Sequence, residues 1–389
     1  MSIADRWLLP DGVEEVLPPS AAHLEAVRRR LLDLFERWGY ELVITPMVEY
    51  LESLLTGTGK DLDLKTFKVT DQVSGRMMGI RADITPQVAR IDAHSLHREG
   101  ASRLCYAGTV LHAKADNMLA SRTPIAVGAE LFGDTGNHGD LEIVSLMIEA
   151  IRAEGITPVH LELGDVGIFR ELVKVAGMPA GTEEKLFELI QRKAVPELGD
   201  LLATLSLAPA MKSKVMALPG LCGDEGVIDE ARRLFESDAA ILARIDALAD
   251  IARRLAARFG ELDIYYDLSE LRGYAYHTGI VFACYVPGTA QRLAKGGRYD
   301  HVGEVFGRAR AATGFDIDLK VLARSSKVAP EPAQRVRIPG GLLDREGLWA
   351  YVAELRRQGF VVVETDGDGN YDFSVEADGE GYKLAGSGS

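Results

Sequence analysis

The chain has 389 residues, of which 47% are apolar and 26% charged, which is the composition of a globular protein and excludes a fibre or a disordered tract. This length allows two or three domains, each able to bury its own core. The formal net charge of −14 repels phosphate backbones, so we expect no nucleic-acid partner.

The N-terminal part of the chain predicts a helix that leads into a strand. Apolar residues recur at three- and four-residue steps from Ser20 to Trp38, with Ser20 as the candidate N-cap and Gly39 as the residue that ends the helix. We expect a strand over Glu41–Ile44, because the Thr45-Pro46 pair that follows cannot continue it.

A second passage from strand to helix is predicted further along, followed by a hairpin. The alternation over Arg76–Ala82 indicates a strand, and Thr85 and Pro86 supply an N-cap and a first helical residue. Two apolar runs, Leu104–Leu111 and Ile125–Phe132, predict a hairpin. The polar stretch between them is long, which favours a functional loop.

The middle of the chain predicts an interrupted sheet with a helical insertion. We expect a helix over Asp140–Ile151, a strand over Val159–Leu163, and helices over about 168–260, where Asp238–Phe259 shows the clearest apolar face. Strands then resume at Leu262–Leu268, Tyr276–Val286 and Arg292–Ala294, the last two joined as a hairpin through Pro287-Gly288.

The C-terminal part predicts a small separate α/β piece. Three prolines make Ala329–Pro339 a candidate linker, so we expect domains over 1–328 and 340–389. The pattern then indicates a helix over Asp344–Gln358 and strands over Val361–Val363 and Tyr371–Val375. We expect the last eleven residues to be frayed.

Several short motifs indicate no metal site and no cofactor. Gly57–Lys60 resembles a phosphate loop only in part, so a surface turn is the better interpretation. His94 and His97 lie three apart without the carboxylate of a zinc protease motif, which favours a solvated face. Three scattered cysteines without a C-x-x-C pair argue against disulfides and thiolate zinc, and no window is apolar enough to span a membrane. We therefore expect a cytoplasmic protein without a membrane partner.

Six segments in chain order resemble the class II histidyl-tRNA synthetase family. They are Phe35–Glu41 with Thr45-Pro46, Arg81–Thr85, Gly128–Gly133 with Asp140–Glu142, Leu271–His277, Gly296–Asp300 and Gly314–Leu319. The resemblance covers about Leu17 to Leu322 and implies an α+β fold, an antiparallel sheet flanked by helices. It also implies self-association through the first segment, which corresponds to the dimer-forming motif 1.

Two positions depart from the chemistry that this family performs. The synthetases hold ATP phosphates with one arginine in motif 2 and one in motif 3, where this chain has His112 and the pair Lys320-Val321. A charge-assisted hydrogen bond contributes about 1.5–3 kcal/mol, so both losses cost on the order of 10² to 10⁴ in transition-state stabilisation. We expect no adenylation, and the acidic segment after Val321 is a poor match for tRNA.

The resemblance nevertheless keeps an amino-acid pocket. A zwitterion needs carboxylates for its ammonium group and a cation for its carboxylate. The positions that contact histidine in the family are occupied here by suitable side chains, namely Asp83, Thr85, Glu130, Arg272, Tyr276 and His277. Asp83 is one methylene shorter than the family's glutamate, and Ala126 stands where the family has a glutamine.

A synthetase fold that keeps its histidine boxes and lacks its ATP clamps resembles a second family, the regulatory subunits of the short-form ATP phosphoribosyltransferase. The resemblance implies a catalytically inert chain that joins the catalytic subunit in a hetero-octamer. It implies that the chain activates this subunit and mediates feedback inhibition by L-histidine in the first step of histidine biosynthesis. An end-product sensor must bind its ligand without consuming it, which fits the retained pocket.

Other interpretations stay open at this point. In a divergent adenylating enzyme or histidyl-tRNA synthetase, Lys114, Lys320 or Arg298 would replace the missing arginines, although lysine lacks the bidentate fork. A paralogue could also bind another amino acid or a protein ligand. Glu130 could simply pair with Arg272, and His112 could be loop surface.

Overall fold

The computed structural model describes residues 7–56, 60–115, 120–178, 181–274, 276–286, 291–329, 332–367 and 369–386. The chain divides into two compact units, Met1–Val328 and Ala329–Ser389, and each has its own apolar core. Two predicted turns lie outside the described residues: most of Gly57–Lys60, of which only Lys60 is described, as the first residue of a helix, and the Pro287-Gly288 connection.

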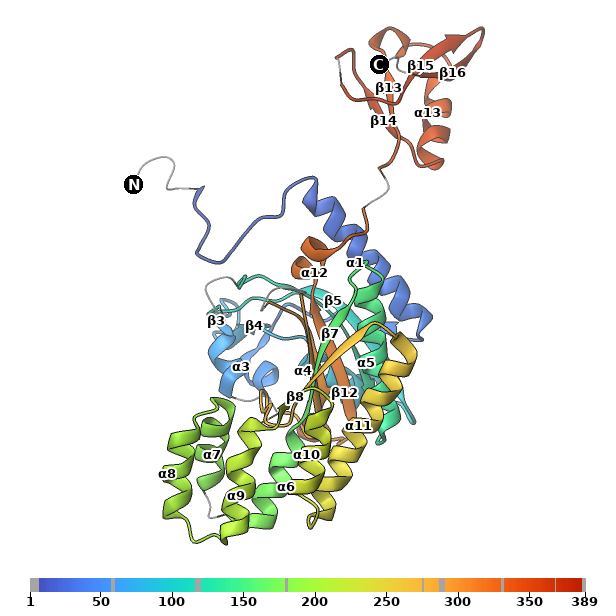
Figure 1. The fold of residues 1–389 in the computed structure, drawn as a ribbon. Helices are drawn as coiled ribbons and strands as arrows, with labels where there is room; N and C mark the ends of the chain where they lie inside the picture. Colours follow the sequence, from blue (N-terminus) through green and yellow to red (C-terminus); the bar gives the residue numbers. More distant parts are fainter. Residues whose placement is uncertain are drawn as a thin grey trace. The chain divides into compact units, whose positions relative to one another are not determined.

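A nine-stranded sheet forms the centre of the first unit (Figure 1), in the order β1-β5-β6-β12-β11-β10-β7-β9-β8. Its strands are β1 (Glu41–Leu42), β5 (Ser102–Thr109), β6 (Ile125–Phe132), β7 (Val159–Asp165), β8 (Cys222–Gly223), β9 (Leu262–Asp267), β10 (Ile280–Tyr285), β11 (Arg292–Arg298) and β12 (Ala312–Asp318). The six strands from β5 to β7 in this order pair antiparallel. Strand β1 pairs parallel with β5, and β9 pairs parallel with β7. The predicted α+β class and the hairpin of β5 and β6 are confirmed.

Helices cover one face of this sheet and bury the larger core. They are α1 (Ser20–Arg37), α5 (Asn137–Arg152), α11 (Ala239–Phe259) and α12 (Leu319–Ser325). Val27, Leu31 and Phe35 of the α1 stripe are fully buried there, and Phe35 meets Phe315 of β12 edge to face at 5.8 Å between ring centroids. Gly39 ends this first helical segment with a positive φ of 83°, as predicted.

The helical segment lies between β7 and β9 in the chain. It contains α6 (Val166–Ala176), α7 (Thr182–Gln191), α8 (Val195–Thr204), α9 (Pro209–Ala217) and α10 (Gly226–Leu234), followed by α11. In Figure 1 these helices, from α6 to α10, gather at one end of the sheet. The segment is not wholly helical, because Cys222 and Gly223 return to the sheet as the edge strand β8.

Smaller elements cover the opposite face around a second apolar cluster. They are α4 (Thr85–Arg90), a π-helix (Ile91–Leu96), α2 (Leu51–Leu55), α3 (Lys60–Lys65) and a three-stranded sheet of β2 (Val48–Tyr50), β4 (Met77–Ile80) and β3 (Phe67–Thr70). The cluster includes Ile84 and Val88 beside Leu104 and Tyr106 of β5. Because alternate residues of β5 face opposite sides, Cys105 belongs to the larger core instead.

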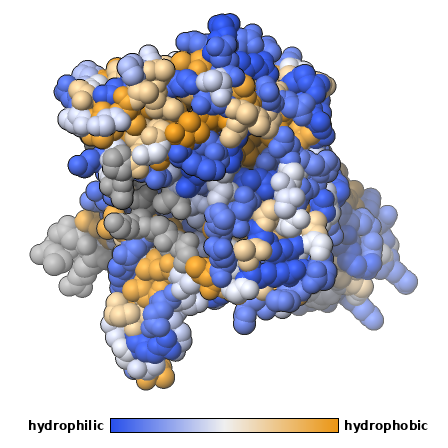
Figure 2. Space-filling view, turned by 90° about the horizontal axis from the view of Figure 1, so that it is seen from below, coloured by the Kyte–Doolittle hydropathy of each residue, from blue (hydrophilic) through white to orange (hydrophobic). Residues whose placement is uncertain are grey.

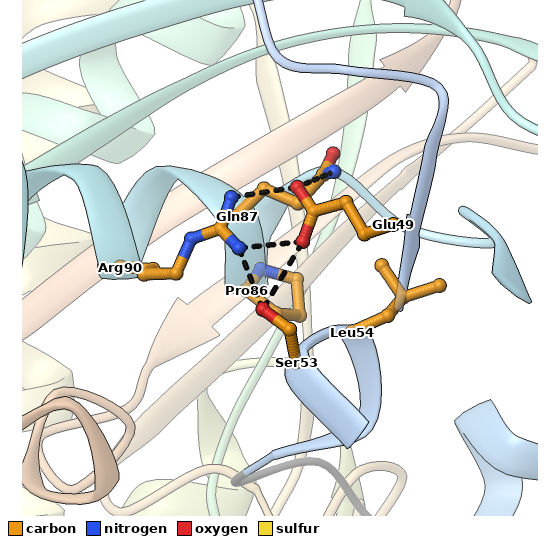
Figure 3. Close-up of a pocket in the computed structure, with 6 residues that line it drawn as sticks. All are labelled: Glu49, Ser53, Leu54, Pro86, Gln87 and Arg90. Atoms are coloured by element: carbon orange, nitrogen blue, oxygen red, sulfur yellow. Dashed lines mark hydrogen bonds and ion pairs between the residues drawn. The ribbon is translucent and has the colours of Figure 1, made fainter. Parts of the chain in front are cut away.

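An ion-pair network ties α4 to the three-stranded sheet (Figure 3). Glu49 of β2 accepts hydrogen bonds from Arg90 at 2.5 and 2.6 Å and from Gln87 at 2.7 Å. Arg90 also donates to Ser53 at 2.8 Å. These side chains pack against one another with no room for a water molecule between them, and we assign the network to holding α4 in place.

The second unit folds as a four-stranded sheet with one main helix. Its elements are β13 (Arg335–Ile338), α13 (Leu348–Arg357), β14 (Val361–Glu364), β15 (Phe373–Asp378) and β16 (Gly381–Gly386), in the sheet order β14-β13-β15-β16. Two predictions are wrong here. The expected linker contains β13, whose Val336 and Ile338 are fully buried, and the expected frayed end pairs with β15 through Gly386.

Two predicted helix caps are also wrong. Pro19 and Ile84 occupy the N-cap positions, so Ser20 and Thr85 are the first helical residues and cap nothing. The strand predicted from Tyr276 begins only at Ile280, because the N–H groups of Tyr276 and His277 close a turn onto the carbonyl of Gly273.

The surface at the insertion end of the first unit mixes hydrophilic and apolar residues. Figure 2 looks onto this face, where hydrophilic residues cover most of the area and apolar patches lie between them. Within the described ranges, no helix is both long enough and apolar enough to cross a membrane.

Candidate functional site

Glu130, at the centre of β6, is the buried focus of a polar cluster. Its carboxylate accepts hydrogen bonds from the hydroxyls of Thr85 at 2.8 Å, Tyr106 at 3.2 Å and Tyr299. Burial raises the pKa of Glu130 to about 8, against the lowering effect of these hydroxyl donors. The site therefore keeps a carboxyl group able to gain or lose a proton close to neutral pH.

Asp83 adds a second carboxylate beside this cluster. It lies just before α4, where its Oδ1 accepts a hydrogen bond from the backbone N–H of Thr85 at 3.0 Å. Its charge contributes to the raised pKa values of Glu130 and Tyr276. Two carboxyl groups so close together are suited to a cationic ligand such as an ammonium group.

Aromatic rings line the same cluster. Tyr276 stacks on Tyr299 with ring centroids 4.9 Å apart and meets the ring of His277 edge to face at 5.3 Å. The hydroxyl of Tyr276 is buried and has no hydrogen-bond partner among the described residues. A buried hydroxyl without a partner is costly to fold, so this one marks a place for a polar ligand group.

His277 lies over the sheet rather than at its edge. A Cβ added to Gly297 of β11 would lie 2.8 Å from the imidazole ring, so the glycine is needed for this contact. Burial lowers the pKa of His277 to about 4, and its Nδ1 lies 3.3 Å from the carbonyl oxygen of Arg298. The ring is therefore neutral at pH 7.

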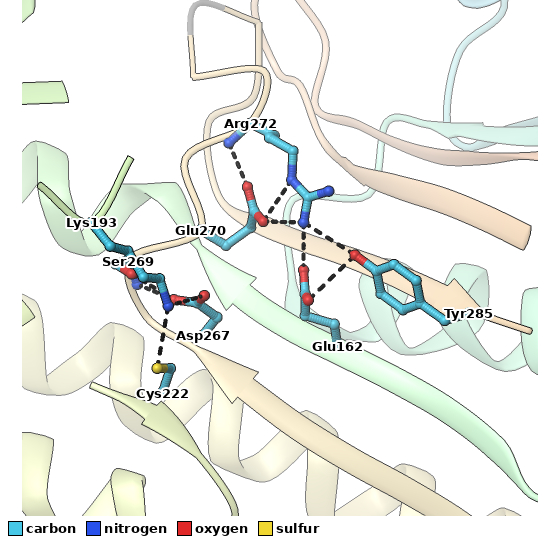
Figure 4. Close-up of polar contacts among 8 residues, drawn as sticks. All are labelled: Glu162, Lys193, Cys222, Asp267, Ser269, Glu270, Arg272 and Tyr285. Carbon is cyan, nitrogen blue, oxygen red and sulfur yellow. Dashed lines mark hydrogen bonds and ion pairs between the residues drawn. The ribbon is translucent and has the colours of Figure 1, made fainter. Parts of the chain in front are cut away.

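Arg272, unlike the other predicted site residues, is bound by groups outside this cluster, which Figure 4 shows. Its guanidinium contacts Glu162 of β7 at 2.9 Å, Glu270 at 2.7 Å and the hydroxyl of Tyr285 at 3.2 Å. Strand β7 lies four strands from β6, which is roughly 19 Å at the usual spacing. The structure thus brings Asp83, Thr85, Glu130, Tyr276 and His277 together. The alternative pairing of Glu130 with Arg272 is wrong.

Two of the three cations that would replace the synthetase arginines, Arg298 and Lys320, are engaged elsewhere. Arg298 is buried and bonds both carboxylate oxygens of Asp140 at 3.0 and 3.1 Å, as well as Asp300. Lys320 is buried and contacts Glu14 at 3.2 Å and the Thr123 hydroxyl at 3.3 Å. Neither side chain is free to receive a phosphate.

His112 is not simple loop surface. It is half buried, its Nε2 lies 3.0 Å from the carbonyl oxygen of Ala82, and its backbone bridges to Thr66. Arg122 at the far end of the loop donates to the His112 carbonyl at 3.0 Å and to the Asp11 carbonyl at 3.1 Å. The base of the loop is therefore fixed, while residues 116–119 lie outside the described ranges.

Tyr106 and Tyr299 belong to the site, although sequence reasoning did not select them. Tyr299 lies in the Gly296–Asp300 box, which supplied a signal for it, whereas nothing around Tyr106 marks it. Its role follows from the pairing of Tyr106 with Gly128, which leaves room for the phenol to reach Glu130. Within the described ranges, no group of three or more His, Cys, Asp or Glu residues is placed to hold a metal ion.

Comparison with known proteins identifies the class of this fold and site. The family model "Histidyl-tRNA synthetase" matches residues 12–322. A histidyl-tRNA synthetase from Nostoc sp. PCC 7120 shares the fold with a TM-score of 0.75, at 17% identity over 95% of this chain and 91% of that chain. The chain has the class II histidyl-tRNA synthetase fold.

Nearer relatives narrow the family. The ATP phosphoribosyltransferase regulatory subunits of Stutzerimonas stutzeri and Azotobacter vinelandii are each 54% identical over 366 residues, covering 94% of this chain and 92% of theirs. A solved structure from Bacillus halodurans C, titled as an ATP phosphoribosyltransferase regulatory subunit/histidyl-tRNA synthetase, matches with a TM-score of 0.81 at 26% identity over 94% of both chains. The chain belongs to the family of ATP phosphoribosyltransferase regulatory subunits.

Proposed function

We propose that this chain is a non-catalytic subunit that activates the catalytic subunit of a short-form ATP phosphoribosyltransferase and makes it sensitive to L-histidine. The observation that carries the histidine part is the pocket around Glu130. A buried carboxyl group with three hydroxyl donors, a second carboxylate at Asp83 and an unpartnered Tyr276 hydroxyl match an amino acid with a polar ring.

The same site lacks what adenylation needs. Valine at position 321 has no donor for a triphosphate, and the engaged state of Arg298 and Lys320 leaves neither as a substitute clamp. Retention of the amino-acid pocket without phosphate clamps supports a sensor over an enzyme. Histidine then acts on the partner through a coupling free energy of typically about 1–3 kcal/mol.

An exposed apolar surface supports the self-association that this role requires. Leu42, Ile44 and Met47 lie at the β1 edge of the large sheet and expose 52%, 88% and 44% of their surface. A cluster of exposed apolar residues beside an open strand edge favours a partner surface, and it falls in the motif 1-like segment. We propose a homodimer through this surface within a hetero-octamer.

The first experiment is calorimetric titration of the purified chain with L-histidine and then with ATP and magnesium. We expect histidine to bind and ATP not to bind. Adding the chain to the catalytic subunit should raise the rate of phosphoribosyl transfer, and histidine should lower it again. Histidine-dependent pyrophosphate exchange would instead support a divergent adenylating enzyme. An unchanged histidine response in Glu130→Ala would leave the boxes as structural remnants.

A further inference from the structure

The strand register places Lys295 on the same face of the sheet as Glu130. Glu130 of β6 is paired with Gly314 of β12, and Gly314 is paired with Gly297 of β11. Lys295 precedes Gly297 by two residues in the same strand. Because side chains two apart point to one face, Lys295 rises from the floor that carries the Glu130 cluster.

Lys295 also lies at a distance from Glu130 that suits one amino acid. The Glu130 side chain extends across β12, since a Cβ added to Gly314 would collide with its carboxylate. From Gly314 to the Cα of Lys295 is one strand across and two residues along, which is about 8 Å at the usual strand geometry. A single histidine can reach from its ring at Glu130 to its carboxylate at this lysine.

Lys295 and Arg272 differ in how firmly they are held. The Lys295 ammonium lies 3.7 Å from Asp316, beyond a normal hydrogen bond, and 48% of its side chain is exposed. Arg272 is bound by Glu162 and Glu270 together. A ligand carboxylate therefore displaces one loose contact at Lys295, whereas Arg272 already binds Glu162, Glu270 and Tyr285.

The surroundings of Lys295 are arranged for a zwitterion. Asp316 is paired with it across the two strands, and the nearby charge of Asp83 contributes to the raised pKa of Asp316, after burial. The ring of His277, which lies against Gly297, is neutral. Burial lowers its pKa, and the charge of Lys295 lowers it further. Lys295 is then a cation that rises from this floor, beside two carboxylates that suit an ammonium group.

We propose that Lys295 binds the α-carboxylate of the amino-acid ligand, while its ammonium group lies between Asp83 and Asp316 and its ring faces Glu130. This proposal rests on the proposed histidine site and assigns one contact within it. Arg272 keeps its place between Glu162 and Glu270 in the ligand-bound chain. Recognition then requires a free carboxylate, so an amine such as histamine binds more weakly than L-histidine.

The test compares L-histidine with histamine, which lacks the carboxylate, by calorimetry on the full chain. Lys295→Met should weaken L-histidine binding about 10- to 100-fold, down towards the affinity for histamine, and leave histamine binding unchanged. Lys295→Arg should restore most of the affinity for L-histidine. Lys68→Met is the matched control, because Lys68 is a similarly exposed lysine in β3 of the three-stranded sheet and also pairs with an aspartate, Asp63.

Several outcomes would overturn the assignment. Unchanged L-histidine binding in Lys295→Met, with normal binding in the unmodified chain, removes Lys295 and leaves the Glu130 pocket standing. Equal weakening of both ligands, or a lowered melting temperature, means a structural role for the lysine. Selective loss of L-histidine in Arg272→Met gives the carboxylate to Arg272 instead. Absence of histidine binding in the unmodified chain removes both the pocket and this contact.

Discussion

The hydroxyl of Tyr299 donates a hydrogen bond to the carboxylate of Glu130, and the two residues lie 169 positions apart in the sequence. The tyrosine follows β11 and the glutamate lies in β6, with β12 between them in the sheet. This contact joins the Gly296–Asp300 box to the Gly128–Gly133 box in one buried cluster. Glycines make room for this cluster, since added Cβ atoms at Gly128 of the second box and at Gly314 of β12 would fill the space used by Tyr106 and Glu130.

The stability of the fold should fall in mildly alkaline solution because of Glu130. Its pKa is raised by burial from 4.5 to about 8, so the folded chain holds a proton that the unfolded chain releases. The resulting stabilisation is complete below about pH 4.5 and is lost as the pH rises through about 8. We expect the melting temperature to decrease between pH 6 and pH 9.

Glu130→Gln should remove most of this decrease, because the amide cannot ionise. The exposed Glu304, which lies in a 3₁₀ turn, provides the control, and Glu304→Gln should keep the slope of the unmodified chain. Differential scanning calorimetry across the pH series measures the effect. Identical slopes in Glu130→Gln and the unmodified chain would contradict the buried, proton-binding state of Glu130.

The pair of Arg298 and Asp140 should be important for stability rather than for phosphate binding. Asp140 is buried and receives two hydrogen bonds from Arg298, so Arg298→Ala leaves a buried carboxylate without its cation. Breaking such a pair costs about 3–5 kcal/mol. Urea unfolding should show a loss of this size.

A suitable control for this measurement is Arg253→Ala. Arg253 pairs with Asp250 on the exposed side of α11, with 71% of its side chain in solvent. Such surface pairs contribute at most about 1 kcal/mol. Equal losses of stability in the two variants would show that Arg298 and Asp140 are not a buried pair.

Local patterns predicted most elements of the large sheet and its helices. The apolar stripe from Ser20 to Trp38 and the hairpin of Leu104–Leu111 with Ile125–Phe132 need only neighbouring residues to be recognised, and both are confirmed. The prediction of a cap at Thr85 is wrong because the helix begins one residue earlier than the pattern indicates, with Ile84 at the N-cap position. The Thr85 hydroxyl instead donates a hydrogen bond to Glu130, 45 residues away, which no local pattern contains.

The geometry of the site depended on contacts that no local pattern contains. The box Leu271–His277 predicts Arg272 and Tyr276 equally as site residues. In the structure Tyr276 stacks on Tyr299 in the Glu130 cluster, whereas Arg272 binds Glu162, which is 110 residues away. Lys295 was not selected, because only the register of three strands places it beside the pocket. Glycine and serine at the end of the chain predict a frayed tail. In the structure Tyr382 and Leu384 alternate within β16 and pack on the core of the second unit.

The apolar surface at the β1 edge should mediate self-association. Ile44 exposes 88% of its surface there, and Ile44→Asp places a charge where a partner would remove water. We expect this variant to shift the chain from dimer to monomer in sedimentation experiments. Val73 exposes 96% of its surface in the turn between β3 and β4, so Val73→Asp is the matched control and should leave the dimer intact. Dimers of unchanged stability in Ile44→Asp would place the interface elsewhere.

The loop His112–Thr123 should respond to histidine, because its base lies against the residues that hold the pocket. His112 contacts the Ala82 carbonyl, and Ala82 directly precedes Asp83. Lys114 is exposed just beyond this contact, so limited trypsin digestion should cleave after it in the free chain. Saturating L-histidine should slow this cleavage about tenfold, which mass spectrometry of the fragments can follow. Cleavage after the exposed Lys383, in the C-terminal unit, serves as the internal reference and should not change. Equal rates at Lys114 with and without histidine would show that ordering of the loop carries no part of the signal to the partner subunit.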